Sequence, residues 1–207
     1  DGYIANGAEP WRLPDVNQIP KIDPSFRTDP ENYLPYERDP ETLARAWVKP
    51  GTPGLEHRVG GLEKDQLTGD VSYDPRNHET MVRLREEKIL KIADDVAPAE
   101  VEGAQEGDLL VVGWGGTYGA LKQGVAAYAD SDKKVGHLHL RWLNPLPREL
   151  DDVFKRFKKV LVCELNRGQL WRHLRAECLV PAEKYTKVQG LPFKVSEIKA
   201  AIDKYLA

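Results

Sequence analysis

Residues 108–128 include the stretch that decides the fold, Asp108-Leu-Leu-Val-Val-Gly113-Trp-Gly-Gly-Thr-Tyr-Gly119. Its run Leu109–Val112 is short and wholly apolar, which is typical of a strand buried on both faces of a sheet. The glycines after this run predict a tight turn, and apolar residues from Leu121 to Tyr128 then recur on one face of a helix. The stretch therefore predicts a buried strand, a turn and an amphipathic helix.

The same alternation of strand and helix continues to the end of the chain. The expected elements are a strand at 135–142, a helix with apolar residues Leu150, Val153, Phe154 and Phe157, a strand at 160–163, a helix over 170–178, an edge strand at 185–188, and a helix capped by Ser196. Alternating units of this length imply a mostly parallel sheet with helices on both faces. We therefore predict a three-layer α/β/α domain over residues 107–207.

Residues 51–106 have a different pattern, which predicts a loop or irregular hairpin followed by one helix. Five glycines between residues 51 and 69 interrupt every apolar run in this part of the segment. The helix should begin after an Asp74 cap, with Pro75 in its first position, where the missing amide does no harm. It should end near Val96, before the next proline.

Residues 12–50 are predicted to form an extended arm, because eight of the 15 prolines of the chain lie within its first 50 residues. Proline fixes φ and removes an amide donor, so no long helix or central strand can form there. Residues 10–50 nevertheless carry five large aromatic side chains, Trp11, Phe26, Tyr33, Tyr36 and Trp47. We expect the arm to pack on the rest of this chain or to bind another domain or subunit.

Composition restricts the class of protein. The chain has 207 residues, 30 basic and 33 acidic side chains and a formal charge of −3, so no nucleic-acid partner is expected. No segment approaches the roughly 18 consecutive apolar residues of a membrane span, so none is expected. The start lacks a signal peptide, which predicts a cytoplasmic protein, and the two cysteines are expected to be free thiols. The sequence begins with Asp1 rather than Met, and residues 1–11 look like the remnant of a preceding domain.

The turn after the first strand is the best candidate for a binding site. Ligands of open parallel sheets bind at the carboxyl ends of the strands, and a helix amino terminus offers free amides to an anion. Gly115, Gly116, Thr117 and Tyr118 are therefore a candidate anion-binding turn, although a tight turn with close packing is the favoured interpretation of the glycines. The spacing matches neither a dinucleotide fingerprint nor a P-loop.

His137 and His139 are two residues apart on one strand, so their side chains face the same side of the sheet. A metal could use both together with Cys163, but no recognised metal-ligand spacing is present. Core or interface histidines are the favoured interpretation. No catalytic residue and no metal ligand are predicted.

Several motifs, in one order, resemble the alpha subunit of 2-oxoacid:ferredoxin oxidoreductases, and the closest type looks like 2-oxoglutarate:ferredoxin oxidoreductase. They are Asp1-Gly-Tyr-Ile-Ala-Asn-Gly-Ala-Glu-Pro-Trp11, Pro50-Gly-Thr-Pro-Gly-Leu-Glu-His-Arg58, Val71-Ser-Tyr-Asp-Pro75, Gly113-Trp-Gly-Gly-Thr-Tyr-Gly119, Leu140-Arg-Trp-Leu-Asn-Pro-Leu-Pro147 and Glu164-Leu-Asn-Arg-Gly-Gln-Leu170. The resemblance implies the carboxyl-terminal portion of that subunit, with a pyrimidine-binding domain ending near residue 11 and a domain similar to the transketolase carboxyl-terminal domain. Gly116 stands where the family pattern has Ser.

The resemblance also implies a function. Such complexes decarboxylate a 2-oxoacid on thiamine diphosphate with Mg, pass electrons through an iron–sulfur cluster to ferredoxin, and form an acyl-coenzyme A. This chain has no motif for those cofactors, so it is predicted to bind none alone and to be an inactive assembly or support domain that needs the beta subunit and the rest of the alpha subunit. The candidate interface residues are Trp11, Trp47, Arg141, Glu164, Asn166 and Arg167. The alternative is a stand-alone anion- or nucleotide-binding module of doubly wound type.

Overall fold

The computed structural model describes residues 15–21 and 24–207. The described residues divide into two compact units, one from Val96 to Ala207 and one that ends at Asp95. In the described part of the chain, no helix is both long enough and apolar enough to cross a lipid bilayer.

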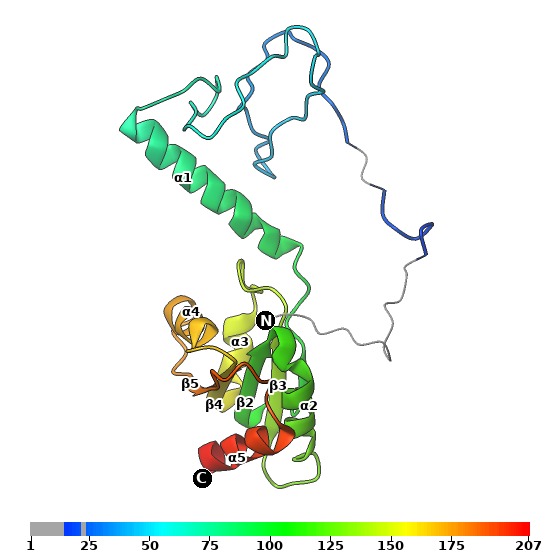
Figure 1. Ribbon diagram of the computed structural model, residues 1–207, viewed down its shortest axis with the longest axis vertical. Helices are drawn as coiled ribbons and strands as arrows, with labels where there is room; N and C mark the ends of the chain where they lie inside the picture. The colour runs from blue at the N-terminus through cyan, green and yellow to red at the C-terminus, as the bar shows by residue number, and fades with distance from the viewer. Residues whose placement is uncertain (1–14, 22–23) are drawn as a thin grey trace. The chain divides into compact units, whose positions relative to one another are not determined.

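A five-stranded sheet forms the centre of the unit Val96–Ala207 (Figure 1). Its strands are β1 (Val101–Gly103), β2 (Gly107–Trp114), β3 (Val135–Leu140), β4 (Phe157–Glu164) and β5 (Glu183–Thr186). The spatial order is β1-β3-β2-β4-β5, and only the β1–β3 pair is antiparallel. The mostly parallel sheet predicted from the alternating pattern is therefore confirmed.

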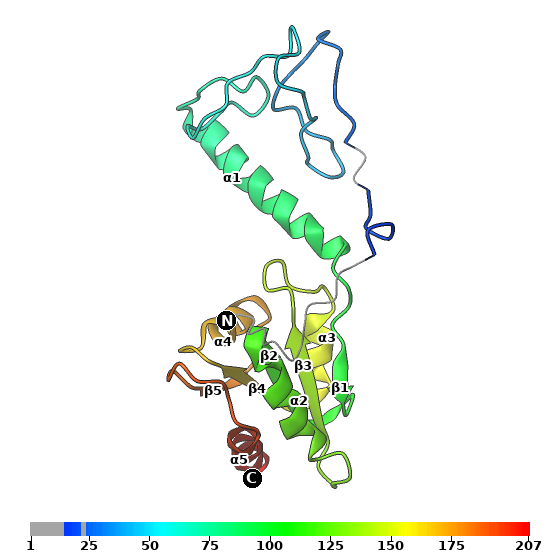
Figure 2. The same ribbon diagram turned by 45° about the vertical axis from the view of Figure 1, so that its right-hand side comes forward.

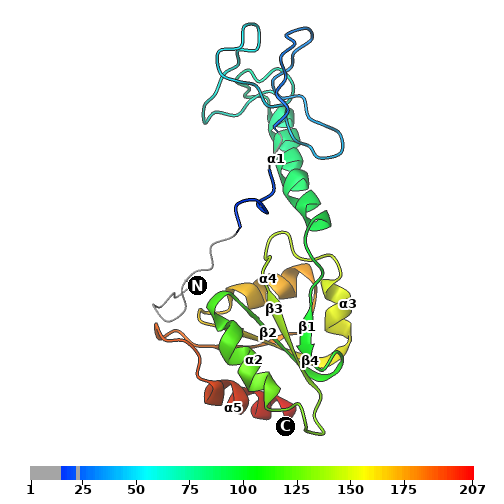
Figure 3. The same ribbon diagram turned by 90° about the vertical axis from the view of Figure 1, so that its right-hand side faces the viewer.

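Helices cover both faces of this sheet. They are α2 (Tyr118–Ala126), α3 (Leu150–Lys155), α4 (Gln169–Glu177) and α5 (Val195–Leu206). The buried side chains of α2 and α5 share one core cluster, and those of α3 and α4 share the other. Figure 3 shows α2 and α5 on one side of the strands and α3 on the opposite side. The three-layer α/β/α architecture is thus as predicted.

The central strand β2 supplies side chains to both cores. Leu109 and Val111 pack in the core under α2 and α5, whereas Leu110 and Val112 pack in the core under α3 and α4. All four are at most 1% exposed, which is why their segment reads as a continuous apolar run. Burial on both faces is what makes β2 the centre of the domain.

Three details of the sheet unit differ from the sequence-based expectation. Phe157 begins β4 rather than extending α3, because its ring is buried in the core and the chain is already extended there. Helix α5 is capped at Lys194, whose amide donates to Glu197 Oε2 at 2.8 Å, and Ser196 lies inside the helix. Strand β1 was not predicted, since three residues carry too little pattern to be recognised.

The unit that ends at Asp95 contains one long helix, α1 (Pro75–Leu90), and a short 3₁₀ turn, Lys91–Asp94. The predicted start is confirmed, because Asp74 Oδ1 accepts the amides of Arg76 and Asn77 at 2.8 and 2.9 Å. The helix ends before Val96. Its predicted apolar face, which includes Val82 and Ile89, is largely exposed within this unit.

The proline-rich arm packs on its own chain. Its loops, together with residues 51–74, lie beside the amino-terminal part of α1 in Figures 1 and 2. Tyr36 N donates to Leu67 O at 3.0 Å, and the Phe26 and Trp47 rings lie 6.0 Å apart. Of the two alternatives for the arm, packing within the chain is therefore realised here. Trp11 lies outside the described residues.

Candidate functional site

The turn between β2 and α2 is a short 3₁₀ turn, Gly115–Thr117, at the carboxyl end of the central strand. Gly115 has a φ of 55°, a left-handed conformation that favours glycine. Thr117 is buried, and its Oγ1 accepts from Trp114 N at 3.1 Å and donates to Trp114 O at 2.8 Å. The Thr117 hydroxyl therefore holds the turn closed, while Gly115 and Gly116 face solvent.

A second glycine permits this turn to pack against the helix that follows. A Cβ atom at Gly113 would lie 2.2 Å from Leu121 Cδ1 and 2.5 Å from Thr117 Oγ1. Any side chain at this position would push α2 away from the end of β2. Close packing thus explains Gly113, as the packing interpretation of the motif predicts.

Tyr118 connects the turn to the edge of the sheet. Glu102 Oε1, on β1, accepts from Tyr118 Oη at 2.9 Å and from Lys122 Nζ at 2.8 Å. The hydrogen bond from Lys122 is the largest of the effects that lower the pKa of Glu102 to about 2, and the Lys122 pKa is raised in turn. Glu102 is therefore ionised at neutral pH and ties β1 to the first turn of α2.

The two histidines of β3 lie under Tyr118. His137 is fully buried, with Nδ1 3.1 Å from Glu102 Oε2, and the His139 ring centroid lies 5.0 Å from that of Tyr118. Burial lowers the pKa of both imidazoles, that of His139 to about 4. Within the described residues, His137 Nε2 and His139 Nδ1 are buried without a hydrogen-bond partner. Both rings are neutral at pH 7; His137 is fully buried and His139 is half-buried.

The arrangement of the strands separates these histidines from Cys163. Strand β2 lies between β3 and β4, so Cys163 is not on the strand next to His137 and His139. Among the described residues, no group of three or more His, Cys, Asp or Glu side chains is placed to hold a metal ion. Cys163 and Cys178 are free thiols, as expected.

A cavity of about 220 Å³ opens at the carboxyl end of β3. Tyr118, His139, Arg141 and Trp142 line it, together with Glu102 and the segment before β1. Arg141 is exposed, so a guanidinium and a tyrosine ring both border this cavity. The predicted turn residue Tyr118 and the predicted interface residue Arg141 are thus brought together.

A larger cavity of about 470 Å³ lies on the other side of the Glu102–Lys122 pair. Val125, Val135 and several alanines form its mainly apolar wall, and Lys133 is among its basic residues. The turn at 115–118 contributes nothing to it.

Glu164 ends β4 and is fully buried. Its carboxylate accepts from Trp114 Nε1 at 3.2 Å, Asn166 Nδ2 at 3.0 Å, Leu170 N at 2.9 Å and Trp171 N at 3.0 Å. A side chain without exposed surface cannot meet a partner in this form of the chain. The interface prediction for Glu164 is therefore replaced by an internal role.

Asn166 completes the cap of α4. Its Oδ1 accepts the amides of Gly168 at 2.7 Å and Gln169 at 3.0 Å, so the capping role considered for Asn166 is observed. Together with Glu164, it engages the four amides from residue 168 to residue 171. An open α/β sheet commonly holds an anionic ligand beside such amides, and here the protein's own carboxylate occupies that position. Arg167, by contrast, is exposed.

Sequence reasoning missed Glu102 and assigned Glu164 to an interface rather than to a helix cap. Nothing in the sequence marked Glu102, because its role depends on the unpredicted strand β1. The sequence did contain a signal for Glu164. It is an acidic residue at the end of an apolar strand, and the next helix, whose Leu170 amide it accepts, begins a few residues later. Such a residue is placed to cap a helix as readily as to bind a partner.

Residues 107–204 match the family "Pyruvate:ferredoxin oxidoreductase core domain II". The chain is 48% identical, over 208 aligned residues and its full length, to the 2-oxoglutarate oxidoreductase subunit KorA of Mycobacterium tuberculosis, of which it spans 32%.

Solved structures show the same relationship. The 2-oxoglutarate:ferredoxin oxidoreductase of Magnetococcus marinus, solved with 2-oxoglutarate, coenzyme A and succinyl-CoA bound, is 30% identical with a TM-score of 0.84 over 94% of this chain and 34% of that chain. A split-gene transketolase matches over 54% of this chain with a TM-score of 0.41, which is too weak to add to the argument. The chain spans about a third of the length of the curated relative and of the Magnetococcus structure. Residues 107–204 thus match core domain II of the pyruvate:ferredoxin oxidoreductases, and the chain along its full length is similar to 2-oxoglutarate oxidoreductase subunits.

Proposed function

We propose that the protein containing this chain oxidatively decarboxylates 2-oxoglutarate to succinyl-CoA and passes the electrons to ferredoxin. The observation that carries this proposal is the 48% identity along the entire chain to a 2-oxoglutarate oxidoreductase subunit. The 30% identical structure, which contains 2-oxoglutarate and succinyl-CoA, supports the same substrate and product.

Within that enzyme, this chain is proposed to be an assembly and support domain that does not catalyse the reaction. Two polar groups at the carboxyl edge of its sheet are committed to internal bonds: Thr117 closes the turn, and Glu164 caps α4. Neither histidine of β3 is suited to proton transfer at neutral pH, because burial disfavours the charged form of each ring. The turn formed by Gly115, Gly116 and Tyr118 is proposed at most as a weak anion site that uses exposed backbone amides.

The cofactors of the reaction are proposed to bind elsewhere in the complex. A cluster or a metal–diphosphate site needs several thiolate or carboxylate ligands close together. Burial is the largest effect that raises the pKa of the Cys163 and Cys178 thiols, the latter to about 12, and so disfavours the thiolate that a cluster requires. The described residues of this chain therefore do not fit an iron–sulfur cluster or thiamine diphosphate with Mg, and coenzyme A is assigned to the whole enzyme.

The proposed partners are the rest of the alpha subunit, the beta subunit and, through the complex, ferredoxin. Three of the predicted interface residues remain available to them, since Trp47 is 55% exposed and Arg141 and Arg167 are also exposed. Asn166 is partly buried in its capping role. We keep the cytoplasm as the proposed compartment.

The comparisons favour this function over the stand-alone anion- or nucleotide-binding module, since the similarity to 2-oxoglutarate oxidoreductases extends along nearly the whole chain. The structure also weighs against that module, because Glu164 and Asn166 occupy the amides of α4 where a phosphate would bind.

The experiment compares the 207-residue chain with the complete enzyme. Each is supplied with coenzyme A, oxidised ferredoxin and either 2-oxoglutarate or pyruvate, and acyl-CoA and reduced ferredoxin are measured. We expect turnover only in the complete enzyme and a higher kcat/KM for 2-oxoglutarate. Turnover by the isolated chain would contradict the support role, and a preference for pyruvate would contradict the proposed substrate.

A further inference from the structure

A separate cavity, of about 260 Å³, lies in the unit that ends at Asp95. The arm lines it with Arg38 and Arg45, and α1 lines it with Arg85 and Lys88. The remaining lining residues are Tyr36, Leu43, Met81 and Leu84, so no acidic side chain among the described residues borders it. Four basic groups therefore surround one small space.

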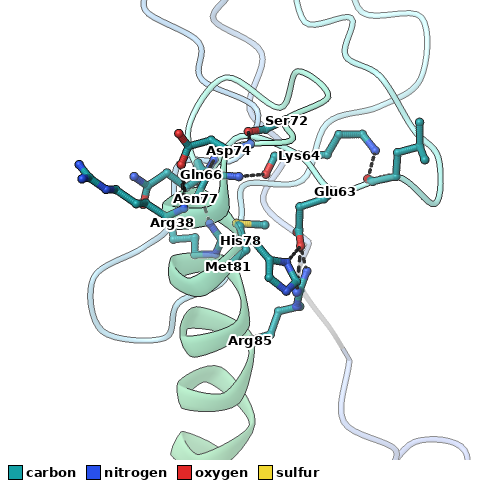
Figure 4. A network of polar contacts seen from close by, with 12 residues as sticks. Arg38, Glu63, Lys64, Gln66, Ser72, Asp74, Asn77, His78, Met81 and Arg85 are labelled. Carbon is teal, nitrogen blue, oxygen red and sulfur yellow. Dashed lines mark hydrogen bonds and ion pairs between the residues drawn. The ribbon is translucent and has the colours of Figure 1, made fainter.

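One of these four charges is already balanced. Glu63 accepts from Arg85 Nη1 at 3.0 Å and Nη2 at 3.5 Å, and from His78 Nδ1 at 2.7 Å (Figure 4). In the part of the chain that the structure describes, no ion pair joins Arg38, Arg45 or Lys88 to a carboxylate. Three uncompensated cations in one cavity repel one another, and a bound anion would reduce this repulsion.

The guanidinium of Arg38 is held in place by uncharged groups. Its Nη1 donates to the carbonyl oxygens of Tyr36 at 3.0 Å and Gln66 at 3.3 Å, and its Nη2 lies 3.7 Å from Met81 Sδ (Figure 4). Partial burial and the nearby charge of Arg45 both lower the pKa of Arg38. The side chain is thus ordered without a counter-ion, and guanidinium donors remain for a ligand.

Arg45 is held in a similar way. Its guanidinium lies 4.1 Å from the centre of the Tyr36 ring, and its Nη1 donates to Pro35 O at 3.5 Å. Stacking on an aromatic face fixes the plane of the guanidinium and leaves its edge free to donate. Two oriented guanidinium groups and the flexible Lys88 ammonium therefore converge on the cavity.

We propose that this cavity binds a phosphate group, either as free phosphate or on a small organic molecule. Paired guanidinium groups match the several oxygens of a phosphate, and a compact dianion balances more charge in this volume than a single carboxylate does. The buried Met81 and the apolar side chains beside it would contact a short organic part. The inference concerns residues that the proposed function does not use.

The test is titration of the 207-residue chain with inorganic phosphate, followed by NMR of the arginine side-chain N–H groups. We expect selective shifts of Arg38 and Arg45, and tighter binding at about pH 8 than at about pH 6, because phosphate gains its second charge in this range. Loss of one charge-assisted hydrogen bond should weaken binding about 10-fold in Arg45→Gln or Lys88→Gln. Arg83→Gln is the matched control, since Arg83 lies on α1, pairs with Glu87 and does not line the cavity.

Two sources of the phosphate are separated by parallel titrations with AMP and phosphoserine. Tighter binding of either than of inorganic phosphate indicates a phosphorylated small molecule, and equal or weaker binding indicates free phosphate. The proposal is overturned if millimolar phosphate leaves the Arg38 and Arg45 signals unchanged, or if Arg83→Gln weakens binding as much as Lys88→Gln does. It is also overturned if a tetraglutamate peptide binds and phosphate does not displace it. Lys88 is exposed, so Lys88→Gln should fold and tests the proposal even if Arg45→Gln does not fold.

Discussion

Glu164 and Trp114 join the carboxyl ends of two neighbouring strands through one hydrogen bond. The indole Nε1 at the end of β2 donates to the buried carboxylate at the end of β4 over 3.2 Å. The same carboxylate caps α4, so it connects two strands and a helix at the edge where such folds usually hold a ligand. The support role proposed for the domain is consistent with this use of the site.

Replacing Glu164 by Gln should destabilise the sheet unit strongly. The amide nitrogen of Gln would face N–H donors of Leu170, Trp171 or Trp114, and at least one buried donor would lose its acceptor. We expect a loss of about 2–4 kcal/mol in the free energy of unfolding, measured by urea denaturation. Glu177→Gln, at the exposed end of α4, is the control and should change stability by less than about 0.5 kcal/mol. Equal effects of the two variants would contradict the capping role.

Two glycines of the same motif should respond oppositely to alanine. In Gly113→Ala the new methyl group would overlap Leu121 and Thr117, and we expect a loss of about 1–3 kcal/mol. In Gly119→Ala the methyl group meets nothing within 4 Å, and the residue lies in α2, so stability should rise by up to about 1 kcal/mol. Thermal and urea unfolding of both variants measure the difference. A stable Gly113→Ala protein would show that packing does not require glycine there.

Stability should fall when the pH is lowered from about 7 to 4.5. The folded-state pKa of His139 is about 4, below the ordinary value of 6.5, because burial disfavours the imidazolium and His137 and Arg141 add positive charge. In this range the unfolded chain binds more protons than the folded chain, so the free energy of unfolding increases with pH, by at most about 1.4 kcal/mol per pH unit for one group. Glu102 titrates lower, near 2, and contributes below this window.

His139→Phe should reduce that pH dependence, because phenylalanine cannot be protonated and can keep the contact with Tyr118. Urea denaturation at several pH values measures the slope. The control variant His78→Phe replaces a largely exposed ring in the other unit. It should leave the pH dependence of the free energy of unfolding of the sheet unit unchanged. An unaltered slope in His139→Phe would mean that another group causes the acid sensitivity.

The cap of α1 should be measurable in the other unit. Asp74→Ala removes the acceptor of the Arg76 and Asn77 amides, and we expect a loss of about 1 kcal/mol in the stability of that unit. Glu79→Ala, on the exposed surface of the same helix, is the comparison. Amide hydrogen exchange in the first turn of α1 reports the change directly, and unchanged protection there would contradict the capping role.

The sequence by itself determined the order of strands and helices from β2 to α5 and the start of α1. These features follow from local causes: an apolar run such as Leu109–Val112 must be buried on both faces, and Asp74 followed by proline satisfies a helix start within a few residues. The candidate turn at Gly115–Thr117 was also locatable, because its glycines directly follow that strand.

Only the tertiary structure decided which polar groups are free and which are engaged. Glu102 reaches His137 only because the unpredicted strand β1 pairs with β3. Arg38 and Lys88 line the same cavity only because the arm folds beside α1. Thr117 and Glu164 looked available in the sequence, yet Thr117 bonds the backbone of Trp114, and Glu164 accepts from Trp114, Leu170 and Trp171. The physical reason is that a polar group buried on folding must find a hydrogen-bond partner, and partners from distant segments leave no periodic signal in the chain.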